Sequence, residues 1–199
     1  MFQVTASLAP DADRAPISFT LADYNPNVLH LVTLPNMILC WALCQTGNPV
    51  VDAAFETEGE LDLTRELKDL FLQFLSSRRI SLSFLSGGWS ENFVNMLYSS
   101  GGGLWDNGDT NTILLGSETI YSPFALEAFA VTVFSVLGRQ LELRREAELF
   151  VAAKRLYFGV GGSLDDFVLK ARNIGARVDT LREETEGVRR GVVRCYFET

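Results

Sequence analysis

Apolar runs of strand length alternate with longer amphipathic stretches along most of the chain. Six runs are predicted to be strands, at residues 17–23, 80–86, 112–117, 149–154, 177–181 and 188–197. Four stretches with helical periodicity are predicted to be helices, at residues 26–44, 61–77, 124–143 and 164–173. Because strands and helices alternate, the pattern indicates an α/β fold built on a mostly parallel sheet.

The last two predicted strands form a different kind of pair. Only residues 182–187 separate them, which is too short for the crossover connection that parallel strands need. We therefore expect an antiparallel hairpin at this point. Residues 17–199 are expected to form one domain, preceded by a segment, residues 1–16, for which the pattern predicts no element.

The composition is that of an acidic globular protein. Hydrophobic residues make up 47% of the chain, and 17 basic against 25 acidic residues give a formal net charge of −8. This argues against disorder and against direct binding of nucleic acid, which needs a dense cationic face. A basic protein partner would be attracted instead. The oily stretches at 28–43 and 124–137 contain polar residues, so we expect no membrane span and an intracellular protein.

The cysteines and the histidine do not suggest metal or thiol chemistry. Cys40 and Cys44 are one helical turn apart, while Cys195 and the single histidine, His30, are distant from each other in sequence. Three cysteines are also too few for a disulfide framework, which favours a reducing compartment. We expect buried cysteines, a structural histidine and no metal site.

Polar, glycine and aromatic residues follow the predicted strands, at the edge where an open parallel sheet binds ligands. These segments are Asp23-Tyr24-Asn25, Gly87-Gly88-Trp89, Ser117-Glu118-Thr119-Ile120-Tyr121, and residues 155–162. A carboxylate at a strand end, such as Asp23, can accept hydrogen bonds from both hydroxyls of a ribose. Trp89 offers a flat face to an adenine. The sequence therefore favours a ligand that contains a nucleoside.

Each of these residues also has a structural interpretation. Asp23 is equally suited to cap the helix that follows it, and Trp89 is suited to a place in the core. Glu118 could be stabilised at a helix N-terminus by the helix dipole, and residues 159–162 could be a turn that leads into a helix. At this point the residues alone leave both interpretations open.

Four segments resemble the protein-histidine N-methyltransferase family, which belongs to the seven-strand class I S-adenosylmethionine-dependent methyltransferases. They are Asp23-Tyr24-Asn25 with residues 28–36, Gly88-Trp89, residues 115–122 (LGSETIYS) and residues 157–162 (YFGVGG). The resemblance covers about residues 17–197. It implies a Rossmann-like sheet, S-adenosylmethionine as cofactor, and transfer of a methyl group to a histidine of a protein substrate.

The resemblance also implies roles for particular residues. The implied cofactor-binding residues are Asp23, Tyr24, Asn25, Gly88, Trp89 and Ser117. Glu118 and Tyr121 are the implied catalytic residues, and Tyr157 and Phe158 the implied substrate-binding residues. Known targets of the family include a ribosomal protein, so a basic protein substrate and a cytoplasmic or nuclear location are expected.

One part of the family pattern is missing. The family begins its methyltransferase domain with a strand and a Gly-x-Gly loop, and this strand lies centrally in the sheet. The first glycine here is Gly47, so no such loop precedes Asp23. We expect the sheet to lack this strand, or residues 2–6 to take its place. Two further functions stay open: a protein-lysine methyltransferase of the same superfamily, and an inactive remnant that serves as a binding module.

Overall fold

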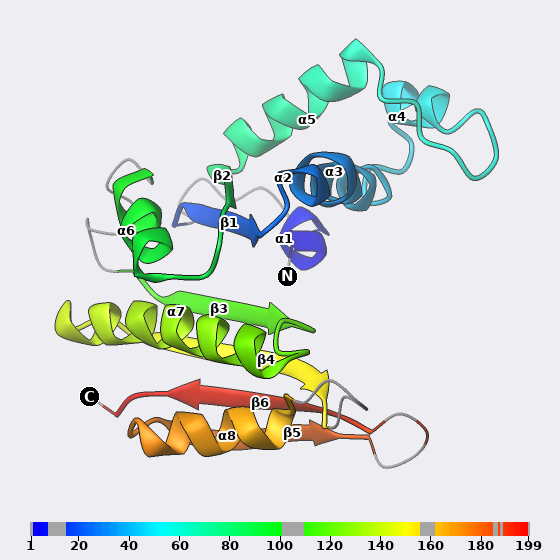
Figure 1. Ribbon diagram of the computed structural model, residues 1–199. Coiled ribbons are helices and arrows are strands. Elements are labelled where there is room, and N and C mark those ends of the chain that lie inside the picture. Colours follow the sequence, from blue (N-terminus) through cyan, green and yellow to red (C-terminus); the bar gives the residue numbers. More distant parts are fainter. Residues whose placement is uncertain are drawn as a thin grey trace. The chain divides into compact units, whose positions relative to one another are not determined.

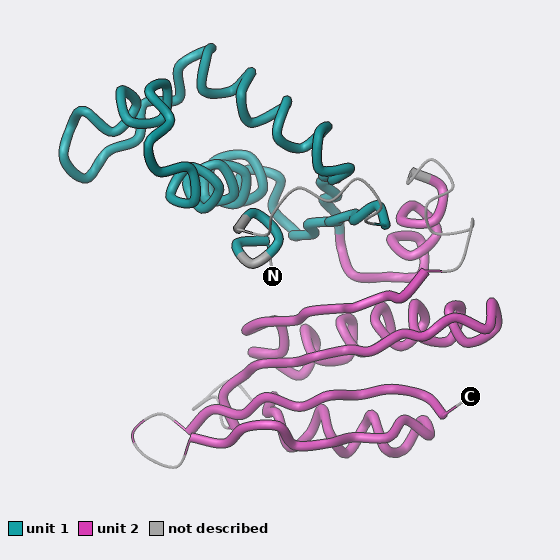
Figure 2. Tube along the Cα trace, turned by 180° about the vertical axis from the view of Figure 1, so that it is seen from behind, with its two compact units in different colours: residues 1–87 teal, residues 88–199 magenta. Residues whose placement is uncertain are grey.

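The structure is a computed structural model that describes residues 2–7, 15–100, 110–155, 162–184, 187 and 189–198. The chain divides into two compact units, Met1–Gly87 and Gly88–Thr199 (Figure 2), and each is described by itself below.

The first unit contains one pair of strands and several helices. Its elements are α1 (Phe2–Ser7), β1 (Ile17–Asp23), α2 (Pro26–Val28), the π-helical turn η1 (Leu29–Thr33), α3 (Leu34–Ala42), α4 (Pro49–Ala54), α5 (Arg65–Ser77) and β2 (Ile80–Ser86). β1 and β2 are parallel and pair in register from Ile17↔Ile80 to Asp23↔Ser86. Consequently the carboxyl ends of the two strands lie side by side.

The core of the first unit joins α3 and α5. Trp41 packs against Phe71 and Phe74 with ring centroids 5.2 and 6.0 Å apart, and Leu67 is fully buried. The predicted helix 26–44 is divided into α2, η1 and α3, because Pro35, in the first turn of α3, has no N–H to continue the helical ladder.

The second unit contains a four-stranded sheet. Its elements are α6 (Glu91–Ser100), β3 (Thr112–Ser117), α7 (Pro123–Glu142), β4 (Ala147–Lys154), α8 (Leu164–Asn173), β5 (Arg177–Glu183) and β6 (Arg190–Tyr196). Figure 1 shows the strand order β3-β4-β6-β5. β3 and β4 are parallel, whereas β6 is antiparallel to both β4 and β5. The predicted C-terminal hairpin is therefore confirmed.

Helices α7 and α8 cover one face of this sheet (Figure 1). Leu149, Val151 and Val193 alternate with less buried neighbours and pack against the two helices. Helix α7 has 20 residues and is long and apolar enough to cross a membrane by length and composition, but 56% of its most apolar window is buried inside the protein. It is the central core helix of this unit. On the opposite face, Ile113 and Leu115 of β3 are 48% and 65% exposed.

The predicted elements agree closely with the observed ones. β1, β2, β3 and α8 have the predicted bounds, whereas β4 begins two residues earlier and β5 ends two residues later than predicted. Helix α5 begins at Arg65 rather than at residue 61, because the hydroxyl of Thr64 accepts the Leu67 N–H and caps the helix there. Helices α1 and α4 were not predicted, because six residues carry too little periodicity to be recognised, and the ten-residue helix α6 was also missed.

The α/β class with parallel strand pairs and a C-terminal antiparallel hairpin is confirmed. Hydrogen bonds join the described strands into two sheets, one in each unit. That residues 17–199 form one domain stays a prediction. In the described sheets β1 pairs only with β2, and β3 pairs only with β4.

Candidate active site

The carboxyl end of β1 forms a tight, hydrogen-bonded turn. Oδ1 of Asp23 accepts the Asn25 N–H at 2.8 Å, and the Asn25 side chain accepts the Asn27 N–H at 3.0 Å. Asn25 is thus the N-cap of α2, whereas Asp23 closes the turn before the helix and does not itself cap it. The second carboxylate oxygen of Asp23 makes no hydrogen bond to any described residue. One acceptor therefore remains available to a ligand, beside the exposed side chain of Tyr24.

The turn after β2 lies beside Asp23. The Gly87 N–H donates to the carbonyl oxygen of Asp23 at 3.3 Å, and Gly88 and Trp89 follow directly in the chain. Within the second unit, the half-buried Trp89 ring packs edge-on against Phe93 and Phe129, with centroids 5.1 and 6.3 Å apart. Trp89 therefore packs against the edge of the hydrophobic core, in line with its structural interpretation.

Phe129 connects Trp89 with the carboxyl end of β3. A Cβ atom at Gly116 would overlap the Phe129 ring, so helix α7 approaches β3 as closely as only glycine allows. Ser117, which follows Gly116, is exposed and ends the strand. The structure thus brings both Trp89 and the end of β3 next to one buried phenylalanine.

Glu118 has the most unusual backbone in this region. Three described residues other than glycine have positive φ, and two of them, Arg79 and Arg144, follow the C-termini of helices, where this conformation is ordinary. Glu118, with φ 55°, instead follows a strand directly. Its N–H donates to the carbonyl oxygen of Ala152 at 3.0 Å, which anchors the backbone to β4. Such local strain is concentrated at functional sites.

The side chain of Glu118 faces a cation. Its Oε1 lies 3.7 Å from Nε of Arg190, the first residue of β6, and the two side chains are 45% and 53% exposed. Helix α7 begins only at Pro123, with Ser122 as its cap. Because the helix dipole acts within the first turn, the helix-dipole interpretation of Glu118 is wrong. Tyr121, three residues further on, is 57% exposed.

Gly162, the one described residue of the second distinctive motif, lies beside the first motif. Gly162, the last residue of the 157–162 motif, has φ 85°, and a Cβ atom there would lie 2.7 Å from the carbonyl oxygen of Ile120 and 2.9 Å from the carbonyl carbon of Ser122. Ile120 is fully buried and holds the Glu118–Tyr121 segment against the core. Tyr157 and Phe158 lie outside the described residues, so their implied role stays a prediction.

Comparison with known proteins finds several relatives that carry the name histidine protein methyltransferase 1. Histidine protein methyltransferase 1 of Saccharomyces cerevisiae is 34% identical over 160 residues, which are 76% of this chain and 40% of that protein. Histidine protein methyltransferase 1 of Schizosaccharomyces pombe is 31% identical over 188 residues, which are 93% and 50%. The Bos taurus protein named histidine protein methyltransferase 1 homolog is 32% identical over 178 residues, which are 88% and 41%.

By sequence, this chain belongs to the histidine protein methyltransferase family. It spans about half or less of the length of the relatives that it matches. No family model matches the chain. The resemblance that the motifs indicated is therefore confirmed at the level of the family.

Methyltransferases of this kind use S-adenosylmethionine, and the residues present fit its nucleoside end. Asp23 follows a parallel strand and has a carboxylate oxygen without a hydrogen-bond partner among the described residues, which suits a ribose hydroxyl. The half-buried Trp89 lies two residues after Gly87, the hydrogen-bond partner of Asp23. No residue set that fits the methionine end is recognisable before Asp23, since the first glycine is Gly47.

Three residues near the site were missed from the sequence. The hydroxyl of Thr119 is buried and has no hydrogen-bond partner among the described residues. Phe129 and Arg190 contact the predicted site residues Trp89 and Glu118. Thr119 lies inside a recognised motif, so its position was available from the sequence. Phe129 and Arg190 come from a helix and a distant strand, and only the packing of α7 and the register of β6 show their role.

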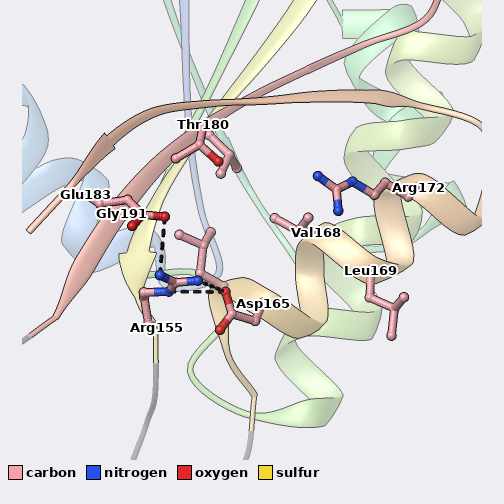
Figure 3. Close-up of a pocket in the computed structure, with 10 residues that line it drawn as sticks. Arg155, Asp165, Val168, Leu169, Arg172, Thr180, Glu183 and Gly191 are labelled. Atoms are coloured by element: carbon pink, nitrogen blue, oxygen red, sulfur yellow. Dashed lines mark hydrogen bonds and ion pairs between the residues drawn. The ribbon is translucent and has the colours of Figure 1, made fainter. Parts of the chain in front are cut away.

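A cavity of about 250 Å³ lies between α8 and the β5–β6 hairpin. Arg155 lies within it, 2.8 Å from Oδ1 of Asp165 and 3.2 Å from Oε1 of Glu183 (Figure 3). The hydrogen bond with Asp165 is the main reason why the pKa of Arg155 is raised. None of the predicted site residues that the structure describes lines this cavity or the second one, of about 250 Å³, beside α7 and β6.

The histidine and the cysteines lie apart from these residues. His30 is exposed in η1, and Cys40 and Cys44 are half-buried, with Sγ of Cys44 donating to the Cys40 carbonyl at 3.4 Å. Burial raises the pKa of the Cys195 thiol to about 12. Across the part of the chain that the structure describes, no group of three or more His, Cys, Asp or Glu residues could hold a metal ion.

Proposed function

We propose that this chain carries the site at which S-adenosylmethionine methylates a histidine side chain of a protein substrate. The proposal rests on the backbone and side-chain geometry of Glu118. Glu118 follows the carboxyl end of β3, and the N–H of its strained backbone donates to Ala152 of β4. Its carboxylate faces Arg190, and the exposed Tyr121 follows three residues later. The relatives named histidine protein methyltransferase 1 support the choice of histidine as acceptor.

Glu118 acts on the acceptor imidazole. Its carboxylate accepts the N–H of one ring nitrogen and so directs the lone pair of the other nitrogen toward the methyl group. Imidazole has a pKa of about 6.5, so much of it is neutral at pH 7 and no strong base is needed. As the ring nitrogen forms the new N–C bond, the methyl C–S bond of the sulfonium would break and the donor would leave as a neutral thioether that keeps the electron pair. The methylated ring would then be cationic, and Glu118 would stabilise this charge until the proton is released to solvent.

The donor supplies an electrophilic methyl group on a sulfonium, and the residues around it bind and orient it. The proposed donor-binding residues are Asp23, Tyr24, Asn25, Gly88, Trp89 and Ser117. Asp23 accepts a ribose hydroxyl with its unbonded carboxylate oxygen, and Trp89 packs against the adenine. Tyr121 lines the acceptor side and excludes water, which makes alignment the main contribution of the enzyme. Tyr157 and Phe158 are the proposed substrate-binding residues.

We further propose that β3 takes another parallel strand on its open edge, the strand that the family has first. β3 pairs only with β4 in the described sheet, has no charged residue, and exposes Ile113 and Leu115. Parallel strands are normally covered on both faces and paired on both edges. In the 199-residue chain, the β3 amides that face this edge should exchange rapidly with deuterium, and strong protection would contradict this proposal.

The protein substrate is expected to be basic, because the chain has a net charge of −8, and a ribosomal protein is the proposed target. The test is methyl transfer from labelled S-adenosylmethionine to basic histidine-containing proteins, with the modified residue located by mass spectrometry. Glu118→Gln should lower the turnover number strongly and leave the donor affinity almost unchanged. Glu127→Gln is the matched control, since Glu127 forms an exposed ion pair with Lys170 on another surface of the same unit. Equal turnover of the two variants would remove Glu118 from the mechanism.

Measurements of methyl transfer and donor binding also distinguish the proposed histidine methyltransferase from two other functions. A lysine methyltransferase would label lysine, whose amine, with a pKa of about 10.4, must first lose a proton. A non-catalytic binding module would keep the fold and contact a protein partner without binding the donor. Calorimetric titration with S-adenosylmethionine decides this point, because a binding module of this kind would give no heat.

A further inference from the structure

Strand β6 places Arg190 next to the carboxylate of Glu118, the proposed catalytic residue. β6 runs antiparallel to β4, so its first residue arrives where β4 ends, opposite Lys154. β3 ends at the same edge of the sheet, because β3 and β4 are parallel and Ser117 pairs with Ala152. The guanidinium of Arg190 thus reaches Glu118 from two strands away, with 3.7 Å between Nε and Oε1.

The backbone of Arg190 is held on both sides. Its carbonyl oxygen accepts the Glu184 N–H at 2.8 Å, and it pairs with Lys154 across the sheet. The next residue, Gly191, is buried under α8, where a Cβ atom would lie 2.7 Å from Cδ2 of Leu164. Arg190 therefore starts from a well-defined point, and only its side chain adjusts.

Glu118, like Arg190, has a fixed backbone and a side chain that can move. Its backbone is anchored by the hydrogen bond to Ala152, but its side chain is 45% exposed and has several rotatable bonds. At 3.7 Å the Arg190 nitrogen attracts the carboxylate without a close hydrogen bond, because such bonds have N···O distances of about 2.7–3.2 Å. Arg190 can thus orient the carboxylate without occupying the lone pair that an imidazole N–H needs.

We propose that Arg190 is a positioning residue, which holds the Glu118 carboxylate in the orientation that accepts the N–H of the substrate imidazole. This inference rests on the proposed function of Glu118 and adds a second residue to it. A half-exposed ion pair is weak, so its loss should reduce the turnover number by about threefold to fivefold. The donor affinity should not change, since Arg190 acts on the acceptor side only.

The first test compares Arg190→Gln and Arg190→Lys by steady-state kinetics. We expect a lower kcat in Arg190→Gln with an unchanged KM for S-adenosylmethionine, and partial recovery in Arg190→Lys, which keeps the charge. The matched control is Arg177→Gln, which removes an exposed ion pair with Glu198 on the same sheet, away from Glu118. In a Glu118→Gln background, Arg190→Gln should have no further effect. A further loss of the same size in that background would overturn the proposal, as would a loss equal to that of the control.

The second test needs no methyl transfer. In protein with ¹³C-labelled glutamate, the side-chain signals of Glu118 are assigned by their loss in Glu118→Gln, and their relaxation reports the order of the side chain. Arg190→Gln should increase the motion of Glu118, whereas Arg177→Gln should not. If the unmodified chain transfers no methyl group but this increase is seen, the proposed function fails and the contact with Arg190 stands. If Glu118 moves no more in Arg190→Gln than in the control, the inference is wrong whatever the activity.

Discussion

Replacing Gly162 by alanine tests the contact that joins the two distinctive motifs. Gly162 has φ 85°, and a Cβ atom there would lie 2.7 Å from the carbonyl oxygen of Ile120 and 2.9 Å from the carbonyl carbon of Ser122. Both neighbours are backbone atoms, and Ile120 is fully buried, so neither can move without disturbing the core. The substitution therefore adds steric overlap to an unfavourable backbone conformation.

The size of each contribution can be worked from a second glycine. Gly175, which ends helix α8, has φ 88°, but nothing lies within 4 Å of the Cβ atom that alanine would add. Gly175→Ala should thus cost only the left-handed conformation, about 1–2 kcal/mol. Gly162→Ala has the same cost and an overpacking cost of about 1–3 kcal/mol in addition. Its total destabilisation should be about 2–5 kcal/mol.

The assay is urea unfolding of both variants and of the unmodified chain, followed by far-UV circular dichroism. The midpoints give the change in the free energy of unfolding, provided that the slopes stay equal. Because the displaced segment, Ile120–Ser122, follows Glu118 directly, methyl transfer should also fall in Gly162→Ala and not in Gly175→Ala. Equal midpoints for the two variants would show that residues 120–122 do not pack against Gly162, and the reasoning would be refuted.

Three further predictions concern the second unit. Gly116→Ala should destabilise the protein by about 1–3 kcal/mol, because its methyl group would overlap the buried ring of Phe129; a change within error in urea unfolding would contradict this contact. Ser163→Ala should cost about 1 kcal/mol by the same measurement, because the Ser163 hydroxyl caps α8 through the Asp166 N–H at 2.9 Å; a loss no larger than that of an exposed serine variant would remove the cap. Burial raises the pKa of Cys195 from 9.0 to about 12, so the folded state retains a proton that the unfolded state loses, and the free energy of unfolding should fall as the pH rises from about 9 to 12. In native protein at pH 8.5, Cys195 should accordingly react with iodoacetamide more slowly than the two half-buried cysteines, and equal rates in peptide mass spectrometry would argue against its burial.

Much of the local structure was predictable because short-range chemistry determines it. The predicted strands at residues 17–23, 80–86 and 112–117 are observed with the same bounds, since apolar runs between turn residues have few alternatives. The caps at Asn25, Ser122 and Ser163 are equally local, because a cap depends only on the N–H groups two or three residues further along the chain.

The chemistry at the strand ends was predictable only in part. The sequence placed Asp23 and Glu118 at the carboxyl ends of strands, and both lie there. It could not decide between structural and functional roles, because these depend on neighbours that are distant in the chain. The structure shows that Asp23 closes the turn before α2, that Trp89 packs against the edge of the hydrophobic core, and that Glu118 lies outside the first turn of α7.

The amino-acid sequence by itself determined the class of the fold, the positions of the strands and the membership of a family, because each follows from residue order over short spans. Tertiary structure alone decided that Arg190 faces Glu118, that Phe129 lies next to both Gly116 and Trp89, and that Gly162 packs against residues 120–122. The physical reason is register and close packing. Which side chains meet across a sheet depends on how strands pair and how near a helix can approach, and neither quantity is encoded in any one segment.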